Sequence, residues 1–528
     1  MRIVYTISLF ILTALASSAQ YPPYHVSIRT AGSTGYYFIE PIEIGNSTNT
    51  QMILDSAGNV IYCKQFPNGN PIDFKLNPGA MMSYGVNGNL FYMMDSTFTI
   101  FDSVSCRNSI QTDTHDIDFL PNGHFLLLGY EWVIMDLSHF PLFYHSTTVG
   151  SAAANVKCVV VQELDAAKNV VFEWHGKDHF SFDDVDPFFL DDTATVDWTH
   201  SNAVTMDADG NILLSTRHFD EITKINRSDS SIMWRFGGRR NEFTFVGDTV
   251  PFYGQHNIRR IANGHVTLYD NGHHLFSHGA RALEYALDEI NMTAEVKWSY
   301  IYDSSMYSIA TGNVQRLANS NTVVNYGFIG SNNVHFNVVD STGSKVFELA
   351  FDDTIVGYRS YNFPTLPWSF NRPVITCRDS AGLHLLDAGA GYHRYLWNTG
   401  ATTESIVVTD TNTFMVFVGD GNGGLISSNK LIVSDTSQPC LLNAVPEFAQ
   451  KETRLFPNPA TREITITNVS SLDFPKRVLV YDINGRVVVD EIAEPDDSGR
   501  SLSLNLDGLL PGIYVVWFGN RSLRFVKV

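Results

Sequence analysis

The chain has 528 residues, which is too long for one ordinary domain. It holds 55 acidic and 35 basic residues, a formal net charge of −20, and this balance argues against nucleic acid, whose binding depends on Lys and Arg neutralising phosphates. The five cysteines show no CxxC spacing, which disfavours a cysteine-type zinc site.

The first 19 residues are typical of a secretory signal peptide. A basic Arg2 precedes an apolar run, and the small residues Ser17, Ser18 and Ala19 follow it. A membrane anchor is the alternative, but the apolar run is shorter than the ~20 residues that a membrane span needs. No other stretch is long enough, so we expect an exported chain with no transmembrane segment.

Residues 20–370 contain a repeated strand-turn-strand pattern. Segments that begin at His115, His200 and His256 each run through a turn into an apolar strand, and read HDIDFLPNGHFLLL, HSNAVTMDADGNILLS and HNIRRIANGHVTLY. A fourth copy, GNVQRLANSNTVVNY, begins at Gly312 and has no histidine. With about 56 residues per unit, the region holds about six units, and four-stranded units repeated radially are the blades of a β-propeller. The pattern therefore predicts an all-β chain whose main part is a six-bladed β-propeller, with five or seven blades as the alternatives.

The spacing between His115 and His200 is longer than the repeat. It indicates an insertion around residues 179–198, HFSFDDVDPFFLDDTATVDW.

Three histidines at one position of a repeat should converge, because equivalent positions in a repeat protein lie at equivalent places in space. The innermost strand of each propeller blade lines the central channel, so we expect His115, His200 and His256 to face one mouth of that channel. A cluster of histidines indicates a candidate catalytic or anion-binding site.

Hairpin geometry adds an arginine to this group. Mirroring the sequence about the DADG turn places His200 opposite Arg217, and cross-strand partners have Cβ atoms ~5 Å apart. His218 is then expected on the other strand face. The NG turns predict two further cross-strand pairs, His256 with Asn271 and His115 with Tyr130. Three amides near the histidines are candidates for orienting them: Asn202, Asn257 and Asn271.

This combination of side chains suits a tetrahedral oxyanion. Arg217 offers a planar fork of donors, and His can act as acid, base or nucleophile near neutral pH. Zinc is the competing interpretation, because three His suit that metal. The neighbouring Arg disfavours a bound dication, and no HExxH or HxH spacing is present, so we predict a sulfuryl or phosphoryl site with neither a metal nor another cofactor.

Residues 371–440 change character to short alternating strands with Gly, Asn and Thr turns. They predict a small β-sandwich with Trp397 in its core. The segment resembles the Ig-like repeats common in secreted proteins of Bacteroidetes-type bacteria. Cys377 and Cys440 bracket it and can form a disulfide in an oxidising compartment.

Residues 452–528 form a further β unit, which opens with LFPNP, passes through VYDINGRVV and ends LDGLLPGIYVVWFGNRSLRFVKV. The whole pattern resembles the C-terminal sorting domain of the type IX secretion system. That resemblance implies the type IX machinery as a partner, and a secreted protein that is extracellular or held at the cell surface.

The repeat region itself resembles a known family. The runs HDIDFLPNGH, DWTHSNAV, STRHFD, WRFGG and GQHNIR occur in the order found in the arylsulfate sulfotransferases, which are built on a six-bladed propeller. The resemblance implies transfer of a sulfuryl group from an aryl sulfate donor to a phenolic acceptor, without a nucleotide sulfate donor. It carries the role of a transiently sulfated histidine onto His256, and contact with the sulfate onto His115, His200 and Arg217.

The chain departs from the best-known bacterial members, since it has no room for their large N-terminal β-sandwich. It resembles a shorter branch of the family. Two other functions therefore stay open, an aryl sulfate hydrolase that uses water as acceptor and a non-catalytic surface adhesin.

Overall fold

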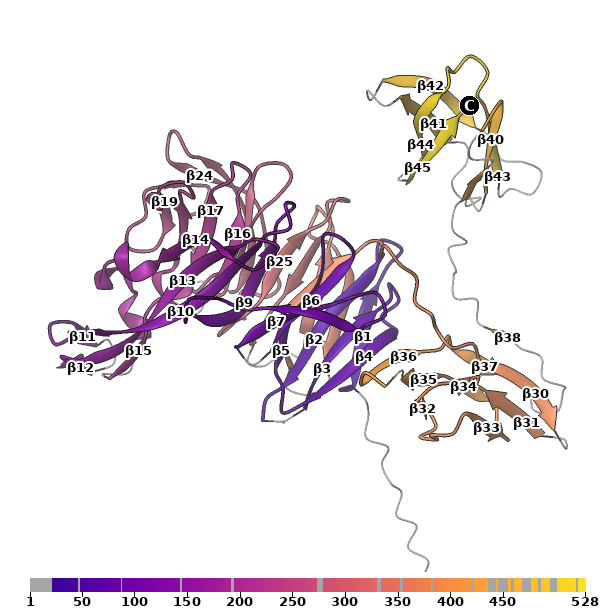
Figure 1. The fold of residues 1–528 in the computed structure, drawn as a ribbon, viewed down its shortest axis with the longest axis horizontal. Helices are drawn as coiled ribbons and strands as arrows, with labels where there is room; N and C mark the ends of the chain where they lie inside the picture. The colour runs from indigo at the N-terminus through magenta and orange to yellow at the C-terminus, as the bar shows by residue number, and fades with distance from the viewer. Residues whose placement is uncertain are drawn as a thin grey trace, which may run out of the picture. The chain divides into compact units, whose positions relative to one another are not determined.

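The computed structural model describes most of the chain from residue 21 onward (Figure 1), and its regular structure is almost wholly β. The predicted signal peptide, residues 1–19, lies outside the described residues. The chain separates into two compact units, one that ends at Ser428 and one that comprises Asn429–Ser434 and the residues after Cys440. The described ranges are 21–45, 48–86, 88–142, 145–190, 194–272, 279–329, 334–351, 355–380, 383–419, 421–434, 443–444, 454–456, 460–467, 476–482, 486–493, 501–518 and 521–528.

Six four-stranded antiparallel units make up most of the first compact unit, as the repeat predicted, and we call each one a blade, named by its first strand in the following order. The blades are β29(Ile355–Phe363)-β2(Tyr36–Glu43)-β3(Thr48–Leu54)-β4(Val60–Pro67), β5(Pro71–Asn77)-β6(Met81–Val86)-β7(Leu90–Met94)-β8(Ile100–Val104), β9(Gln111–Phe119)-β10(Phe125–Met135)-β13(Ala154–Leu164)-β14(Val170–His175), β16(Ser201–Met206)-β17(Ile212–Thr216)-β18(Glu221–Ile225)-β19(Ile232–Gly237), β21(His256–Arg260)-β22(Val266–Asp270)-β23(Arg281–Asp288)-β24(Thr293–Ile301) and β25(Asn313–Arg316)-β26(Thr322–Asn325)-β27(Val334–Val339)-β28(Lys345–Phe351).

The first strands of the blades contact one another in a closed ring, in the order β5, β9, β16, β21, β25, β29 and back to β5. This is the closure that a six-bladed propeller requires. Further strands extend three blades: β1(Tyr24–Arg29) pairs with β28, β15(Thr195–Asp197) pairs in parallel with β13, and β20(Thr244–Val246) pairs in parallel with β24.

The side chains of a strand alternate between the two faces of its sheet, and both faces of the β16 blade are buried. In β17, Leu214 packs into a core that includes Trp174 of the β9 blade, whereas Leu213 packs into a core that includes Phe236 and Tyr285. Burying each such side chain contributes about 1.5–3 kcal/mol.

The predicted insertion before His200 contains two short 3₁₀ helices and β15, and a third 3₁₀ helix directly precedes it. The helices are η1(Gly176–Asp178), η2(Phe182–Asp184) and η3(Pro187–Phe189). This segment places Phe189 and Asp197 beside the mouth of the ring, where they contact Arg217 and His200. Two short strands, β11(Pro141–Leu142) and β12(His145–Val149), also lie outside the six blades.

Ion pairs join the inner strands within the ring. Arg359 of β29 donates to Asp73 of β5 and to Asp116 of β9, at 2.8 Å in each case. Arg259 of β21 donates to both carboxylate oxygens of Asp116 at 2.8 Å. Removing one partner of such a buried network is costly, because it leaves an uncompensated charge.

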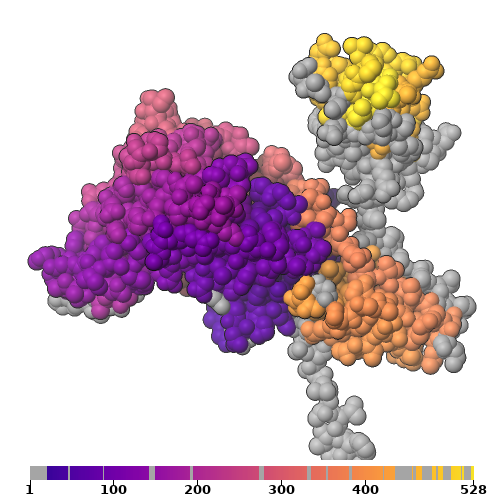
Figure 2. Space-filling view, in the orientation of Figure 1, coloured from indigo at the N-terminus to yellow at the C-terminus, as the bar shows by residue number. Residues whose placement is uncertain are grey.

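The predicted sandwich after residue 370 joins the propeller through a shared sheet. β36(Gly424–Ser427) pairs with β4, so that the β29 blade continues into β35(Val416–Gly419) and β32(Arg394–Trp397), and Figure 2 shows the orange surface of this segment against the indigo N-terminal strands. Trp397 is buried, as predicted. The other strands here are β30(Thr376–Ser380), β31(Leu383–Asp387), β33(Ser405–Val408) and β34(Asn412–Phe414). The domain boundary at 371 stays a prediction.

Cysteine pairing agrees in part with expectation. Cys377 is disulfide-bonded, and its predicted partner Cys440 lies outside the described residues. Three cysteines are free and buried: Cys63, Cys106 and Cys158.

The second compact unit holds two sheets over one apolar core that includes Ile464, Val480 and Phe525. One sheet is β39(Arg454–Phe456)-β40(Glu463–Thr467)-β43(Ser501–Asn505), and the other is β42(Val487–Ala493)-β41(Lys476–Asp482)-β44(Gly512–Phe518)-β45(Arg521–Lys527). A short pair, β37(Leu431–Val433) and β38(Asn443–Ala444), precedes them. No helix in the described ranges of the chain is long and apolar enough to cross a membrane.

Candidate functional site

Each predicted histidine lies at an irregularity of its inner strand. In β9 the register changes from Leu127↔Ile117 to Leu128↔Asp113, so the residues between Asp113 and Ile117, His115 among them, bulge from the ladder. In β16 the extra residue is Asn202, directly after Ser201, and in β21 the pairing shifts between His256 and Arg259. Bulges re-aim side chains and are common beside active sites. The β25 strand, whose repeat has no histidine, keeps an unbroken register.

The four predicted residues come together at the mouth of the ring. The rings of His115 and His200 lie 5.3 Å apart, centroid to centroid. The side chains of these two histidines are each 26% exposed, whereas His256 is 2% exposed, so solvent reaches the first two and the third is buried. Burial, followed by the charge of Arg217 and the proximity of His200 and His115, holds the pKa of His256 well below its ordinary value.

Arg217 lies beside His200, as predicted, but for a different reason. The DADG hairpin pairs Met206 with Ile212, one residue out of the predicted register, and the bulge at Asn202 restores that register, so that the Arg217 N–H donates to the His200 carbonyl at 3.2 Å. The side chain donates through Nη2 to the Ile309 carbonyl at 2.8 Å.

Within the part of the chain that the structure describes, one buried donor of Arg217 is left unsatisfied. Its Nε is buried and has no hydrogen-bond partner among the described residues. The guanidinium packs over the Phe189 ring at 4.8 Å, and burial lowers the pKa of Arg217 to about 10. A buried, unsatisfied N–H of a cation is costly unless a ligand accepts from it. The site therefore suits an anion.

His256 is held by neutral groups. Its Nδ1 lies 2.8 Å from Oδ1 of Asn271 and 3.0 Å from the Gly254 carbonyl, both of which only accept, so Nδ1 carries the proton. Its Nε2 accepts from the Thr311 N–H at 3.1 Å. The imidazole is thus a neutral tautomer with its lone pair on Nε2.

His115 and His200 are held by carboxylates instead. Nδ1 of His200 lies 2.6 Å from Oδ2 of Asp197, and Nδ1 of His115 bonds to Oδ1 of Asp113. Burial raises the pKa of each aspartate, but the histidine beside it and Lys157 outweigh burial, so both carboxyl pKa values lie below their usual range. Because carboxylates accept, both imidazoles carry a proton on Nδ1 and leave Nε2 for a ligand.

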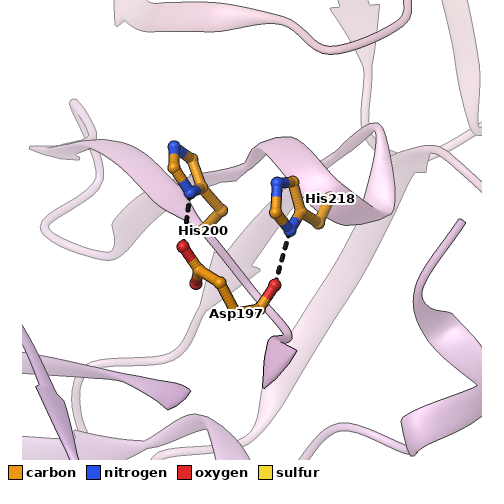
Figure 3. A group of neighbouring side chains, drawn as sticks. All are labelled: Asp197, His200 and His218. Atoms are coloured by element: carbon orange, nitrogen blue, oxygen red, sulfur yellow. Dashed lines mark hydrogen bonds and ion pairs between the residues drawn. The ribbon is translucent and has the colours of Figure 1, made fainter. Parts of the chain in front are cut away.

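His218 belongs to the site, contrary to the sequence prediction that placed it on the other strand face. β17 ends at Thr216, and η4(Arg217–Phe219) is a 3₁₀ turn, so strand alternation does not apply there. The His218 ring stacks on His200 at 4.6 Å, and its Nδ1 donates to the Asp197 carbonyl at 2.6 Å (Figure 3). Burial, and then His200 and Arg217, hold the pKa of His218 well below its ordinary value.

One group of side chains in the described ranges has metal-ligand spacing. Atoms of Asp197, His200 and His218 that could bind a metal all lie within 4.8 Å of one another. However, His218 Nδ1 donates a proton to a carbonyl, His200 Nδ1 donates to Asp197, and the two rings stack in parallel (Figure 3). Nδ1 of each ring therefore carries a proton and cannot bind a metal, which leaves the Nε2 atoms and Asp197 as the possible ligands.

Two predicted cross-strand pairs are wrong. Tyr130 pairs with Gln111 and not with His115, because the bulge in β9 shifts the register. His256 pairs with Tyr269 and not with Asn271, although the Asn271 side chain still reaches the His256 ring. Of the three amides proposed to orient histidines, Asn271 contacts one of them directly, whereas Asn202 donates to the Gln255 carbonyl.

The fourth repeat, which begins at Gly312, has no room for a histidine at that position. Gly312 occupies the position that His256 holds in its own repeat, at φ +103°, and a Cβ there would lie 2.4 Å from the ring of Tyr269. Tyr269 is the strand partner of His256. The space for a side chain at this position is therefore already filled by the neighbouring blade.

The residues that sequence reasoning missed carry a local signal. Asp113 precedes His115 in DTH, and Asp197 precedes His200 in DWTH, whereas His256 follows Gly-Gln. Lys157, in β13, has no such signal. It enters the site through the pairing of β13 with β15 and through the sheet that β13 shares with β10 and β9.

Comparison with known proteins gives a family for most of the chain. A family model described as Arylsulfotransferase (ASST) matches residues 29–361, and one described as Secretion system C-terminal sorting domain matches residues 454–527. No curated protein matches the sequence.

Similar solved structures are distant in sequence. A protein of unknown function from Bacteroides caccae has 9% identity and a TM-score of 0.39, over 62% of this chain and 98% of that one. Virginiamycin B lyase from Staphylococcus aureus has 10% identity and a TM-score of 0.34, over 63% and 98%. PorZ, a surface component of the type IX secretion system of Porphyromonas gingivalis, has 11% identity and a TM-score of 0.27, over 91% and 68%.

Proposed function

Because the chain belongs to the arylsulfotransferase family, we propose that it transfers a sulfuryl group from an aryl sulfate donor to a phenolic acceptor, through a sulfated His256. Its C-terminal type IX sorting domain makes it a secreted or cell-surface protein, so the reaction takes place outside the cell. No nucleotide sulfate is required in this scheme.

The unsatisfied Nε of Arg217 is the observation that carries the proposal. It is a buried cationic donor beside three histidines, and Nδ1 of each histidine is occupied by a protein acceptor. A tetrahedral sulfuryl group supplies the missing acceptor. In a loose transition state charge gathers on the equatorial oxygens, and donors fixed in advance stabilise it without reorganisation.

His256 is suited to be the nucleophile because it stays neutral. Its lone pair on Nε2 attacks sulfur, the N–S bond forms, and the S–O bond to the aryl oxide breaks. The hydrogen bond from the Thr311 N–H to Nε2 must open for this attack, and the freed N–H can then donate to a sulfuryl oxygen.

His200 is proposed to exchange the proton. In its doubly protonated form it gives the Nε2 proton to the departing aryl oxide, and the neutral imidazole then takes a proton at Nε2 from the acceptor phenol while the phenol oxygen bonds to sulfur and the N–S bond breaks. Burial holds the pKa of His200 below its ordinary value, against the opposing effect of Asp197. General acid–base catalysis of this kind is usually worth ~10²–10⁴-fold. His115, when Nε2 also carries a proton, donates a hydrogen bond to a sulfuryl oxygen.

The test is release of the chromophore from 4-nitrophenyl sulfate, with and without added phenol. We expect phenol-dependent release in the wild type, and at least a ~10³-fold loss in His256→Ala, the scale seen when a catalytic nucleophile is removed. His265→Ala is the matched control, because His265 lies in the turn of the same hairpin and pairs with Glu284.

Other outcomes separate the alternative functions. Release that does not depend on phenol indicates a hydrolase. No turnover with any phenol, together with ligand binding that tolerates His256→Ala, indicates an adhesin. Undiminished phenol-dependent release by His256→Ala would show that the nucleophile is another group.

A further inference from the structure

Lys157 lies behind two of the histidines. It stands on β13 directly opposite Asp197 of β15. Its Nζ is 3.6 Å from Oδ2 of Asp113 and 3.9 Å from Oδ2 of Asp197, and the side chain is 19% exposed. The ammonium also lies over the Tyr130 ring, 4.1 Å from its centroid. One cation thus bridges two carboxylates, and we call this group the Asp113–Lys157–Asp197 bridge.

The two carboxylates of the bridge belong to different parts of the chain. Asp113 comes from the inner strand of the β9 blade, and Asp197 comes from the inserted segment that leads into the β16 blade. Each holds Nδ1 of its own histidine. The bridge is therefore the connection that fixes His115 and His200 relative to each other.

We propose that Lys157 is a positioning residue for sulfuryl transfer: by neutralising the repulsion between Asp113 and Asp197 it keeps His115 and His200 in one arrangement, with both Nε2 atoms presented to the sulfuryl group. This inference rests on the proposed function and adds a residue that touches neither substrate nor nucleophile.

The physical reason is the mutual repulsion of the carboxylates. Each Oδ2 atom lies within 4 Å of the same ammonium, whose charge offsets the repulsion that two ionised carboxylates in one partly buried site exert on each other. Without the cation, one carboxyl turns away or takes up a proton. Either change releases a histidine from its Nδ1 acceptor, and a displacement of ~1 Å at a reacting group can cost ~10²-fold in rate.

The charge of Lys157 should also affect how the rate of sulfuryl transfer depends on pH. The positive charge of Lys157 disfavours a second positive charge on the two histidines, and we expect its loss to raise the pKa of His200. The other charged or titratable groups that face them come from every neighbouring element: Tyr130 of β10, Arg217 and His218 of η4, His256 of β21 and Tyr358 of β29. A change at position 157 removes none of these groups, although Lys157 lies over the Tyr130 ring and opposes the rise in its pKa that burial causes.

The experiment compares Lys157→Met, Lys157→Arg and Lys177→Met with the wild type. Lys177 is the matched control, because it is a lysine of the same region that pairs with one carboxylate, Glu131, at 2.6 Å. For each protein, kcat/KM for phenol-dependent sulfuryl transfer is measured from pH 5 to pH 9, alongside the thermal unfolding midpoint.

We expect Lys157→Met to lower kcat/KM by ~10–10²-fold and to move the acidic limb of its pH profile to higher pH. Lys157→Arg should restore both within a few-fold, and Lys177→Met should match the wild type. A folded Lys157→Met with the wild-type rate and profile overturns the inference. So does a Lys157→Met that loses rate and stability together without a change in profile and is not rescued by Arg, because that is a purely structural role.

These results are distinct from failure of the proposed function. If the wild type itself transfers no sulfuryl group to any phenol, the function is wrong and the inference falls with it. If the wild type is active and only the profile of Lys157→Met stays unchanged, the inference alone is wrong.

Discussion

His256 and His200 occupy the same position of consecutive repeats, but their partners differ in charge. His200 is held at Nδ1 by the carboxylate of Asp197, whereas His256 is held by an amide and a carbonyl. A carboxylate stabilises an imidazolium, and a neutral acceptor in a buried site does not. The repeat therefore decides where an imidazole lies, and its partner decides whether that imidazole is suited to carry a proton or to attack as a neutral base.

We expect the largest loss of activity when the carboxylate that holds His200 loses its charge. Asp197→Asn keeps the shape of the side chain but allows the amide to donate to Nδ1, which favours the wrong tautomer of His200. A comparable change in a serine protease triad costs ~10⁴-fold, and we expect a ~10²–10⁴-fold fall in kcat for sulfuryl transfer. Asp229→Asn, in an exposed turn, is the control. A fall of less than a few-fold would mean that Asp197 does not set the tautomer.

Adding a negative charge beside His256 should lower kcat/KM by an intermediate amount. Asn271→Asp gives His256 the kind of partner that His200 has, so the pKa of His256 rises and more of it is protonated at a given pH. We expect a loss of ~10-fold in kcat/KM at pH 6 that becomes smaller at pH 8, since each unit of pKa shift changes the neutral fraction by about tenfold below that pKa. An equal loss at both pH values would point to geometry and not to charge.

The smallest effect concerns stability. His256 and His218 have folded-state pKa values well below the ordinary value of about 6.5, so the unfolded chain binds protons that the native chain does not as pH falls below about 6.5. Their contribution to stability is thus complete above that pH and is lost below it. The thermal midpoint of the wild type should fall between pH 7 and pH 5, and that of His256→Asn should fall less steeply. Parallel curves would contradict the burial of a neutral His256.

The sequence predicted the repeat, the all-β class and the meeting of the three histidines with Arg217, because period and turn signals survive in a single sequence. It did not predict the bulges. The bulge in β9 breaks the expected pairing of Tyr130 with His115, and the bulge in β16 restores the pairing of Arg217 with His200. A mirror image about a turn assumes an unbroken ladder, and no local signal marks where a ladder gains a residue.

Lys157 was not predicted either, because its contacts are made between residues that are distant in the sequence. It lies 40 positions from Asp197 and 44 from Asp113 in the chain. The β9-β10-β13 sheet brings it to Asp113, and the parallel pairing of β15 with β13 brings it to Asp197. The carboxylates had a local signal, since each shortly precedes its histidine. Spacing in sequence can show such neighbours, but not a contact made across a sheet by an inserted strand.

The ring is closed by strands from both ends of its own sequence: β29 pairs with β2, and β28 pairs with β1. These contacts join residues more than 300 positions apart, for example Tyr24 with Phe351, and such non-local pairings form late because a long loop must first be closed. β29 also carries Tyr358, whose hydroxyl donates to the His115 carbonyl at 2.7 Å. The site can therefore be completed only after the last propeller strand has been synthesised and has docked, so a chain caught part-way through folding or export is a chain without sulfuryl-transfer activity.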